Sequence, residues 1–223
     1  MGIRDAASII LLRQTGAGPK VLMGQRGSRA AFMPSKYVFP GGAVDPTDAD
    51  VALAEGLHPV CRARLEQPAP DNRPVPPASA LAAAAIRELW EEAGLALAVP
   101  GAVSCLPPDW QGLAARGLAP SGHGLRFIFR AITPPGGPRR FDARFFLADA
   151  AAVAGDLDDF SAASDELGHL HWLPLSQARR LDLPFVTEVV LAEVAALMGR
   201  EGPPPPVPFF DNSGPRPAFR RIA

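Results

Sequence analysis

The sequence predicts a mixed α/β (α+β) fold. Runs of β-branched and aromatic residues recur near the start and in the second half of the chain, an alanine-rich helix pattern stands between them, and an amphipathic helix pattern follows. The 223 residues suit one domain with appendages, and 48% of them are hydrophobic, which is ample for a buried core. We therefore expect residues 1–223 to form a single domain.

The first elements form a predicted β-hairpin. SIILLRQ (8–14) and VLMGQR (21–26) have strand composition, and the intervening TGAGPK (15–20) is a turn rich in glycine and proline. A shorter β-rich run, residues 37–39, ends at a Pro-Gly-Gly break at 40–42. A glycine pair there lets the backbone take a positive φ or approach another group closely.

The segment 49–79 has a different character. A short helical pattern comes first, and the stretch after it is too rich in proline for a helix or a central strand, so we expect a surface loop with polyproline character. Ser79 then suits an N-cap, and Gly94 suits a C-terminal stop. A helix should lie between these two residues, because alanine, leucine and glutamate favour helix.

The remaining chain carries further strand and helix patterns and ends in a proline-rich tail, residues 200–223, which we expect to lie extended along the surface. Residues 149–168 are loop-like and acidic. The predicted strands are 95–99, 124–132, 139–149 and 170–175, and the predicted helices are 176–181 and 185–199.

The strand pattern at 139–149 places three charged side chains, Arg140, Asp142 and Arg144, on one face. Two interpretations remain open. Either this charged face is available to a ligand, or the strand is half-exposed and carries an ion pair across that face.

Composition bears on the expected partners and location. A formal net charge of -1 gives no electrostatic reason to expect a nucleic acid or a membrane surface as partner. Cys61 and Cys105 form no CxxC pair, which is typical of a reducing compartment. The N-terminal apolar run is only about six residues long, too short for a signal peptide or a membrane span. We therefore expect a cytoplasmic protein.

Three acids crowd one side of the predicted long helix. Glu88, Glu91 and Glu92 fall within a sector of roughly 100°, where like charges repel. Arg87 can pair with Glu91 one turn away, which leaves Glu88 and Glu92 without a partner in the helix. Hard divalent cations such as Mg²⁺ take carboxylate oxygens, so two glutamates one turn apart can supply two ligands. A solvated acidic face is the alternative.

RELWEEAGL, residues 87–95, matches the second half of the Nudix box. The sequence therefore resembles the Nudix hydrolases. The first half of the box stands upstream, where Gly42 follows Phe-Pro-Gly and Asp48 takes the position of the usual glutamate. Residues 49–86 separate the halves, so we expect an insertion at 49–79 within the box. A box interrupted in this way is similar to that of the peroxisomal coenzyme A diphosphatase subgroup.

The resemblance implies an α/β/α sandwich with a central mixed sheet and an inserted loop or helical segment. It also implies a Mg²⁺ or Mn²⁺ ion held mainly by Glu88 and Glu92. Glu91 would assist them, and the backbone carbonyl near Gly42 would be a further ligand.

Further site residues follow from the same resemblance. Family members often take one more acid from a late loop as ligand or general base, and Glu166 stands at the similar position, with Asp165 as the alternative. Glu91 is a second candidate for the base, and Arg87 would brace Glu91, so the catalytic candidates are Glu91, Glu166 and Arg87. The arginines expected to contact phosphate are Arg26, Arg29, Arg140 and Arg144.

The implied activity is hydrolysis of the diphosphate linkage in a small molecule of the type nucleoside diphosphate linked to X. Coenzyme A or acyl-CoA is one candidate substrate; ADP-ribose, a nucleotide sugar and a damaged nucleotide are the others. A non-catalytic module that senses a nucleotide is an alternative of a different class, although such a module would be expected to lose the glutamates. Many relatives pair as dimers, so a homodimer is a further expectation.

Overall fold

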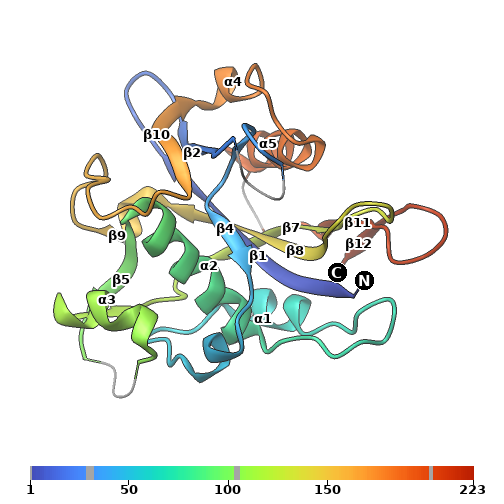
Figure 1. Cartoon of the computed structure of the whole chain (residues 1–223), viewed down its shortest axis with the longest axis horizontal. Helices are drawn as coiled ribbons and strands as arrows, with labels where there is room; N and C mark the ends of the chain where they lie inside the picture. The colour runs from blue at the N-terminus through green and yellow to red at the C-terminus, as the bar shows by residue number, and fades with distance from the viewer. Residues whose placement is uncertain (1, 29–32, 103–105, 201–202) are drawn as a thin grey trace.

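The computed structural model describes residues 2–28, 33–102, 106–200 and 203–223. Its centre is a mixed β-sheet with helices on both faces (Figure 1). The expected α/β class with a central mixed sheet is therefore confirmed. Arg29 and Cys105 lie outside the described residues.

The main sheet has the strand order β10-β2-β1-β8-β7-β11-β12, with β3 on β2 and β4 on β1. β1 is antiparallel to β2, as the predicted hairpin requires, and it is parallel to β8. β7 is antiparallel to β8 and parallel to β11. The strands of this path are β1 Ile3–Arg13, β2 Lys20–Arg26, β7 Arg126–Ile132, β8 Arg140–Asp149, β10 Leu167–Pro174, β11 Val207–Asp211 and β12 Ala218–Ile222.

Alternate residues of β1 face opposite helix layers. Ile9 and Leu11 belong to the core that packs on α2, whereas Ile10 and Leu12 belong to the core that packs on α5. α1 lies on the same side as α2, and α4 lies on the same side as α5 (Figure 1). The helices of the two layers are α1 Pro59–Leu65, α2 Ala78–Ala93, α4 Leu175–Ala178 and α5 Phe185–Leu197.

The long helix α2 begins before the predicted N-cap. Pro77, not Ser79, precedes its first turn and makes no side-chain cap. Proline suits this place because it has no N–H to leave unpaired. At the other end Gly94 has a φ of 70° and its N–H donates to the carbonyl of Trp90 at 2.9 Å, so the predicted C-terminal stop is confirmed.

The predicted break at residues 40–42 is wrong in part, because the chain continues there as a strand. β3 (Tyr37–Val38) pairs with β2, and β4 (Gly41–Ala43) pairs antiparallel with β1. A Cβ at Gly41 would lie 2.6 Å from the carbonyl oxygen of Ala7, so the absence of a side chain is what allows this close pairing.

Shorter elements complete the fold. A small second sheet pairs β5 with β6 and β9, and the predicted strand at 95–99 is confirmed as β5. The remaining elements are β5 Ala96–Pro100, β6 Leu118–Pro120, β9 Val153–Ala154, α3 Gln111–Ala115 and the 3₁₀ helices Pro46–Asp50, Pro108–Trp110 and Ala150–Ala152. Among the described residues, no helix is both long and apolar enough to cross a membrane.

The segment 49–79 contacts the main sheet through a side chain, whereas the C-terminal tail adds strands to it. Within the segment, α1 is followed by a proline-rich connection whose Arg73 donates to carboxylates on β1 and β8, those of Asp5 and Asp142. The tail was expected to lie extended on the surface; instead β11 and β12 form a hairpin that lengthens the sheet beyond β7. Burial of Val207 and Phe209 in the core on the α2 side holds the hairpin there.

Candidate active site

A cleft of about 560 Å³ opens where β4 and the C-terminal half of α2 meet the main sheet. One end is charged and includes Arg26, Glu88, Glu91 and Glu166. The rest of the lining is mainly apolar but also includes Arg4 and Arg139, and it comes from β1, β8, the start of α5 and Phe210 of the tail hairpin. The cleft therefore combines acids with room for a larger organic group.

The glycine pair of β4 lies directly against the glutamates of α2. The N–H of Gly41 donates to Oε2 of Glu92 at 2.7 Å. A Cβ at Gly42 would lie 2.5 Å from Cδ of Glu88 and closer still to Oε1, so only glycine leaves room for that carboxylate. Segments far apart in the sequence thus meet as one site.

Arg87 joins the two segments more firmly. Its guanidinium donates to both carboxylate oxygens of Asp48, at 2.9 and 3.0 Å, and to the carbonyl of Ala43 at 3.0 Å. The same group donates through Nη1 to Glu88 at 3.0 Å and to Glu91 at 3.2 Å. The expected contact with Glu91 is present, but the bidentate partner of Arg87 is Asp48.

Burial gives the glutamates unusual protonation behaviour. Burial raises the pKa of Glu88 to about 7, against the opposing charge of Arg87. Burial and then repulsion from Glu88 raise the pKa of Glu92 to about 8. Burial also raises the pKa of Glu91. Without a bound cation the ionised forms of these glutamates are therefore disfavoured, and a cation beside them would favour ionisation.

The donor set fits a hard divalent cation. Glu92 is 2% exposed and has no ion pair with any residue that the structure describes. Within the described ranges, no group of three or more acidic, histidine or cysteine side chains forms a complete metal site. Mg²⁺ commonly takes one or two carboxylates and fills its remaining positions with water and substrate phosphate, so Glu88 and Glu92 suffice as protein side chains.

The structure separates the two late acids. Glu166 lines the cleft, and its charge acts on all three glutamates of α2. Asp165 is exposed and does not line the cleft. The position of Glu166 therefore suits a role beside the acids, whereas that of Asp165 does not.

Of the four arginines expected to contact phosphate, the three that lie among the described residues differ in position. Arg26 lines the cleft, its charge favours ionised Glu92, and its buried Nε has no hydrogen-bond partner among the described residues. Arg140 and Arg144 do not line the cleft. Arg140 donates to the carbonyls of Thr133 and Asn212, at 3.1 and 2.7 Å.

The pleat of β8 explains why these two arginines miss the cleft. Alternation does place Arg140, Asp142 and Arg144 on one face, as predicted, but that face is turned toward the side of α2 and the proline-rich connection. Arg144 is 1% exposed and pairs there with Asp5 and Asp142. Of the two interpretations, the ion-pair one describes this face, although the pairs are buried rather than half-exposed.

The opposite face of β8 lines the cleft instead, which sequence reasoning missed. Phe141, Ala143 and Phe145 all contribute, together with Arg4 of β1 and Arg139 just before β8. The alternating apolar residues were visible in the sequence, but nothing local says which face of a central strand looks into a cleft. Only the neighbouring elements decide that.

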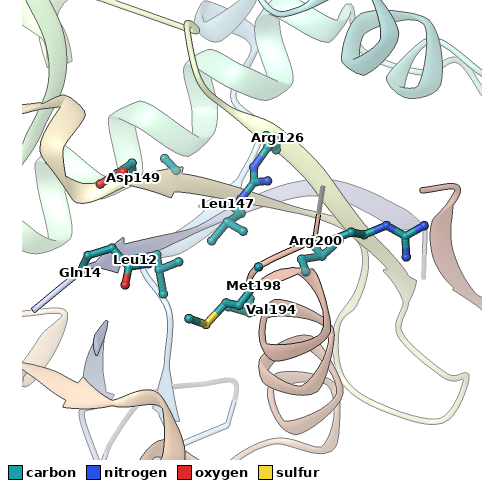
Figure 2. A pocket seen from close by; sticks show the side chains of 11 residues that line it. Leu12, Gln14, Arg126, Leu147, Asp149, Val194, Met198 and Arg200 are labelled. Carbon is teal, nitrogen blue, oxygen red and sulfur yellow. The ribbon is translucent and has the colours of Figure 1, made fainter. Parts of the chain in front are cut away.

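A second cavity of about 260 Å³ lies at the other end of α5 (Figure 2). Its lining includes Leu12, Leu147 and Val194, while the side chain of Arg200 extends away from these residues. The start of α5 lines the cleft and its end lines this cavity, so the cavity is separate from the acidic site.

Two relatives of known name resemble the chain in sequence. It is 30% identical over 183 residues to nudix hydrolase 7 of Caenorhabditis elegans, a match that covers 76% of this chain and 51% of that protein. It is 34% identical over 125 residues to the acyl-coenzyme A diphosphatase NUDT19 of Gallus gallus, covering 44% of this chain and 33% of that one. The matches thus span about half and a third of these relatives' lengths. No protein-family model matches the sequence.

A solved structure resembles the chain over nearly its whole length. The crystal structure of a NUDIX hydrolase from Alicyclobacillus acidocaldarius is 32% identical and has a TM-score of 0.63, with 87% of this chain and 92% of that chain covered. This chain belongs to the Nudix hydrolase family. Its Nudix box is divided in sequence, yet Gly42 lies against Glu88 and Asp48 pairs with Arg87. The box of this Nudix protein is therefore continuous in space.

Proposed function

We propose that this chain is a Mg²⁺- or Mn²⁺-dependent Nudix hydrolase that cleaves the diphosphate linkage of a nucleoside diphosphate joined to another group, X. The proposed substrate of this type is coenzyme A or acyl-CoA. One observation carries the proposal: Glu88 and Glu92 lie buried against the glycine pair of β4, and Glu88 lines the charged part of a cleft large enough for an organic diphosphate. A bound cation would stabilise the charged form of carboxylates buried in this way.

Each residue of the site has a proposed part. Glu88, Glu92 and the backbone carbonyl of Gly42 would hold the cation. When bound, the ion would neutralise diphosphate charge and orient water. Arg26, whose Nε has no hydrogen-bond partner among the described residues, would donate to a phosphate oxygen. Arg87 keeps Glu88 in position through the bond of 3.0 Å described above.

Glu166 is the favoured general base. It would accept a proton from the attacking water while the water oxygen bonds to phosphorus and the bridging P–O bond breaks, which releases two phosphomonoesters. Glu91 is the weaker candidate because one of its oxygens accepts a hydrogen bond from Arg87 at 3.2 Å. Glu166 lines the cleft and makes no hydrogen bond or ion pair with the described residues.

The substrate class rests on one relative and on the shape of the cleft. The Gallus gallus relative is named an acyl-coenzyme A diphosphatase, and the largely apolar walls would suit a long organic substituent. ADP-ribose, nucleotide sugars and damaged nucleotides have the same diphosphate chemistry, so the assay must include them.

The test is a product assay. We expect the chain with Mg²⁺ to release phosphomonoesters from coenzyme A or acyl-CoA faster than from ADP-ribose, NADH or dinucleoside polyphosphates. Glu92→Gln should abolish most turnover while thermal unfolding remains cooperative. Tight binding of a nucleotide without any released product would instead indicate a sensing module.

A pair of variants tests the base. Glu166→Gln should lower kcat by about 100-fold or more, the usual contribution of a general base. Asp165→Asn is the matched control, since it changes a neighbouring acid outside the cleft. Equal effects of the two substitutions would contradict the assignment.

A further inference from the structure

We propose that the Nudix cleft has a second anion-binding subsite, formed by Arg4 and Arg139 beside Phe141, which takes a phosphate on the ribose of the substrate. The preferred substrate class is then a nucleoside diphosphate that carries an additional phosphomonoester. This assignment rests on the proposed function, because it places the remainder of the same substrate.

The register of the sheet brings the three side chains together. β1 and β8 are parallel neighbours in which Arg4 stands opposite Phe141. Arg139 precedes Phe141 by two positions and lies just before the start of β8. All three line the cleft. Arg4 therefore stands beside Phe141 on the neighbouring strand, and Arg139 stands two positions before Phe141 along the chain.

The charges of the two arginines are not used within the protein. The side chains of Arg4 and Arg139 are exposed and make no hydrogen bond or ion pair with the residues that the structure describes. On the opposite face of the sheet, by contrast, Arg73, Arg130 and Arg144 all pair with Asp142. Unpaired guanidinium groups in a cleft are suited to bind a phosphate in a bidentate manner.

The position of the arginines relative to the acids fits one nucleoside. Gly42 pairs with Ala7 of β1, and Arg4 lies three residues from Ala7 along the strand, about 10 Å away. This gap can be spanned by two lengths in series. One is a ribose that carries the diphosphate and a second phosphate, and the other is an arginine side chain. The diphosphate would lie at Gly42 and the additional phosphate near Arg4.

An aromatic surface beside the arginines can take the base. The ring of Phe185 is 67% exposed although it lines the cleft, and it stands edge-on to Phe210, with centroids 6.2 Å apart. An exposed ring of this kind is costly in water and offers its free face for stacking on a planar base. Phe219 is also exposed, at 61%, but does not line the cleft.

The test compares two soluble nucleotides by calorimetry on the full chain with Mg²⁺. Adenosine 3′,5′-bisphosphate should bind about tenfold more tightly than AMP, the effect of a hydrogen-bonded charge. Arg4→Gln and Arg139→Gln should each remove most of this difference without weakening AMP. Phe185→Ala should weaken both nucleotides alike. Arg126→Gln and Phe219→Ala are the controls, because both side chains are exposed and lie outside the cleft.

Turnover separates this inference from the proposed function. Coenzyme A and 3′-dephospho-coenzyme A differ by this one phosphate, and Arg4→Gln should raise KM for the first only. Equal binding of the two nucleotides by the wild-type chain would overturn the subsite even if both diphosphates are cleaved. Arginine-dependent preference for the bisphosphate with no cleavage would support the subsite and contradict the proposed function.

Discussion

The guanidinium of Arg87 donates to both carboxylate oxygens of Asp48, through Nε at 2.9 Å and through Nη2 at 3.0 Å. The two side chains are 4% and 0% exposed, and the segment 49–86 separates them in sequence. Because the remaining nitrogen of Arg87 donates to Glu88 and Glu91, the pair positions the acids of the cleft. The aspartate at the position of the usual glutamate of the box therefore contacts Arg87, which in turn contacts Glu88 and Glu91.

Asp48→Asn should lower both stability and activity. It leaves the buried charge of Arg87 without its bidentate partner, so we expect a loss of about 3 kcal/mol in the free energy of unfolding. Asp50→Asn, at an exposed position two residues away, is the control and should change stability little. Denaturant unfolding measures both. An Asp48→Asn protein as stable as the control would show that the ion pair contributes nothing net.

Gly42→Ala should impair turnover more than folding. The new Cβ would overlap the Glu88 carboxylate and displace it, and a misplacement of about 1 Å can cost about 100-fold in rate. Gly56→Ala is the matched control, because a Cβ at Gly56 would have no other atom within 4 Å. Initial rates at saturating Mg²⁺ and circular dichroism separate the two effects. Full activity of Gly42→Ala would mean that the position of Glu88 is not critical.

The stability of the metal-free protein should fall as the pH rises from about 4.5 to 8. Glu88 and Glu92 have pKa values of about 7 and 8 in the folded protein, above the ordinary value of 4.5, so the folded state binds more protons than the unfolded chain in this window. The loss is complete only above the folded pKa values. Other charges facing the pair are those of Arg87, Arg26, Glu91 and Glu166.

Thermal unfolding in a chelator, from pH 5 to pH 9, measures this effect. Glu92→Gln should flatten the profile and stabilise the metal-free protein at pH 8 by at least about 1 kcal/mol. Glu66→Gln changes an exposed acid at the C-terminal end of α1 and is the control. Added Mg²⁺ should stabilise the wild-type protein more at pH 8 than at pH 6, since ligands must be deprotonated. A wild-type profile as flat as that of Glu92→Gln would contradict the burial of these charges.

Arg73→Ala should loosen the segment between the two halves of the box. Arg73 pairs with Asp142, which is fully buried, and with Asp5 at 3.2 Å, so its removal should cost about 2 kcal/mol. Arg62→Ala removes a well-exposed pair with Glu66 and should cost less than about 1 kcal/mol. Limited proteolysis should then cut the proline-rich connection faster in Arg73→Ala alone. Equal cleavage of the two variants would show that Arg73 does not anchor the connection.

The acidity of Asp142 gives the same network a pH signature. Burial acts to raise its pKa, but the hydrogen bond from Arg130 and the charges of Arg144, Arg130 and Arg73 outweigh burial and lower it. The stability that the cluster contributes is therefore present above the ordinary aspartate pKa of about 3.9 and is lost as the pH falls through the lower folded value.

The sequence by itself determined the elements whose signals are local. The period of the acids and alanines predicts α2, Gly94 predicts its end, and the alternation at 139–149 predicts which residues share a face. The motif at residues 87–95 also identified Glu88 and Glu92, the two glutamates that contact β4. These properties depend on neighbours within a few positions, so sequence alone reveals them.

Only the tertiary structure decided which face of β8 looks into the cleft. The parallel partner β1 and helix α5 turn Phe141 toward the site, while Asp5 and Arg73 bury Arg144 on the other side. The tertiary structure also decided the conformation of the tail, because its strand β11 forms by pairing with the edge of β7. Such choices are set by contacts between distant segments and their electrostatic partners, which no local pattern encodes.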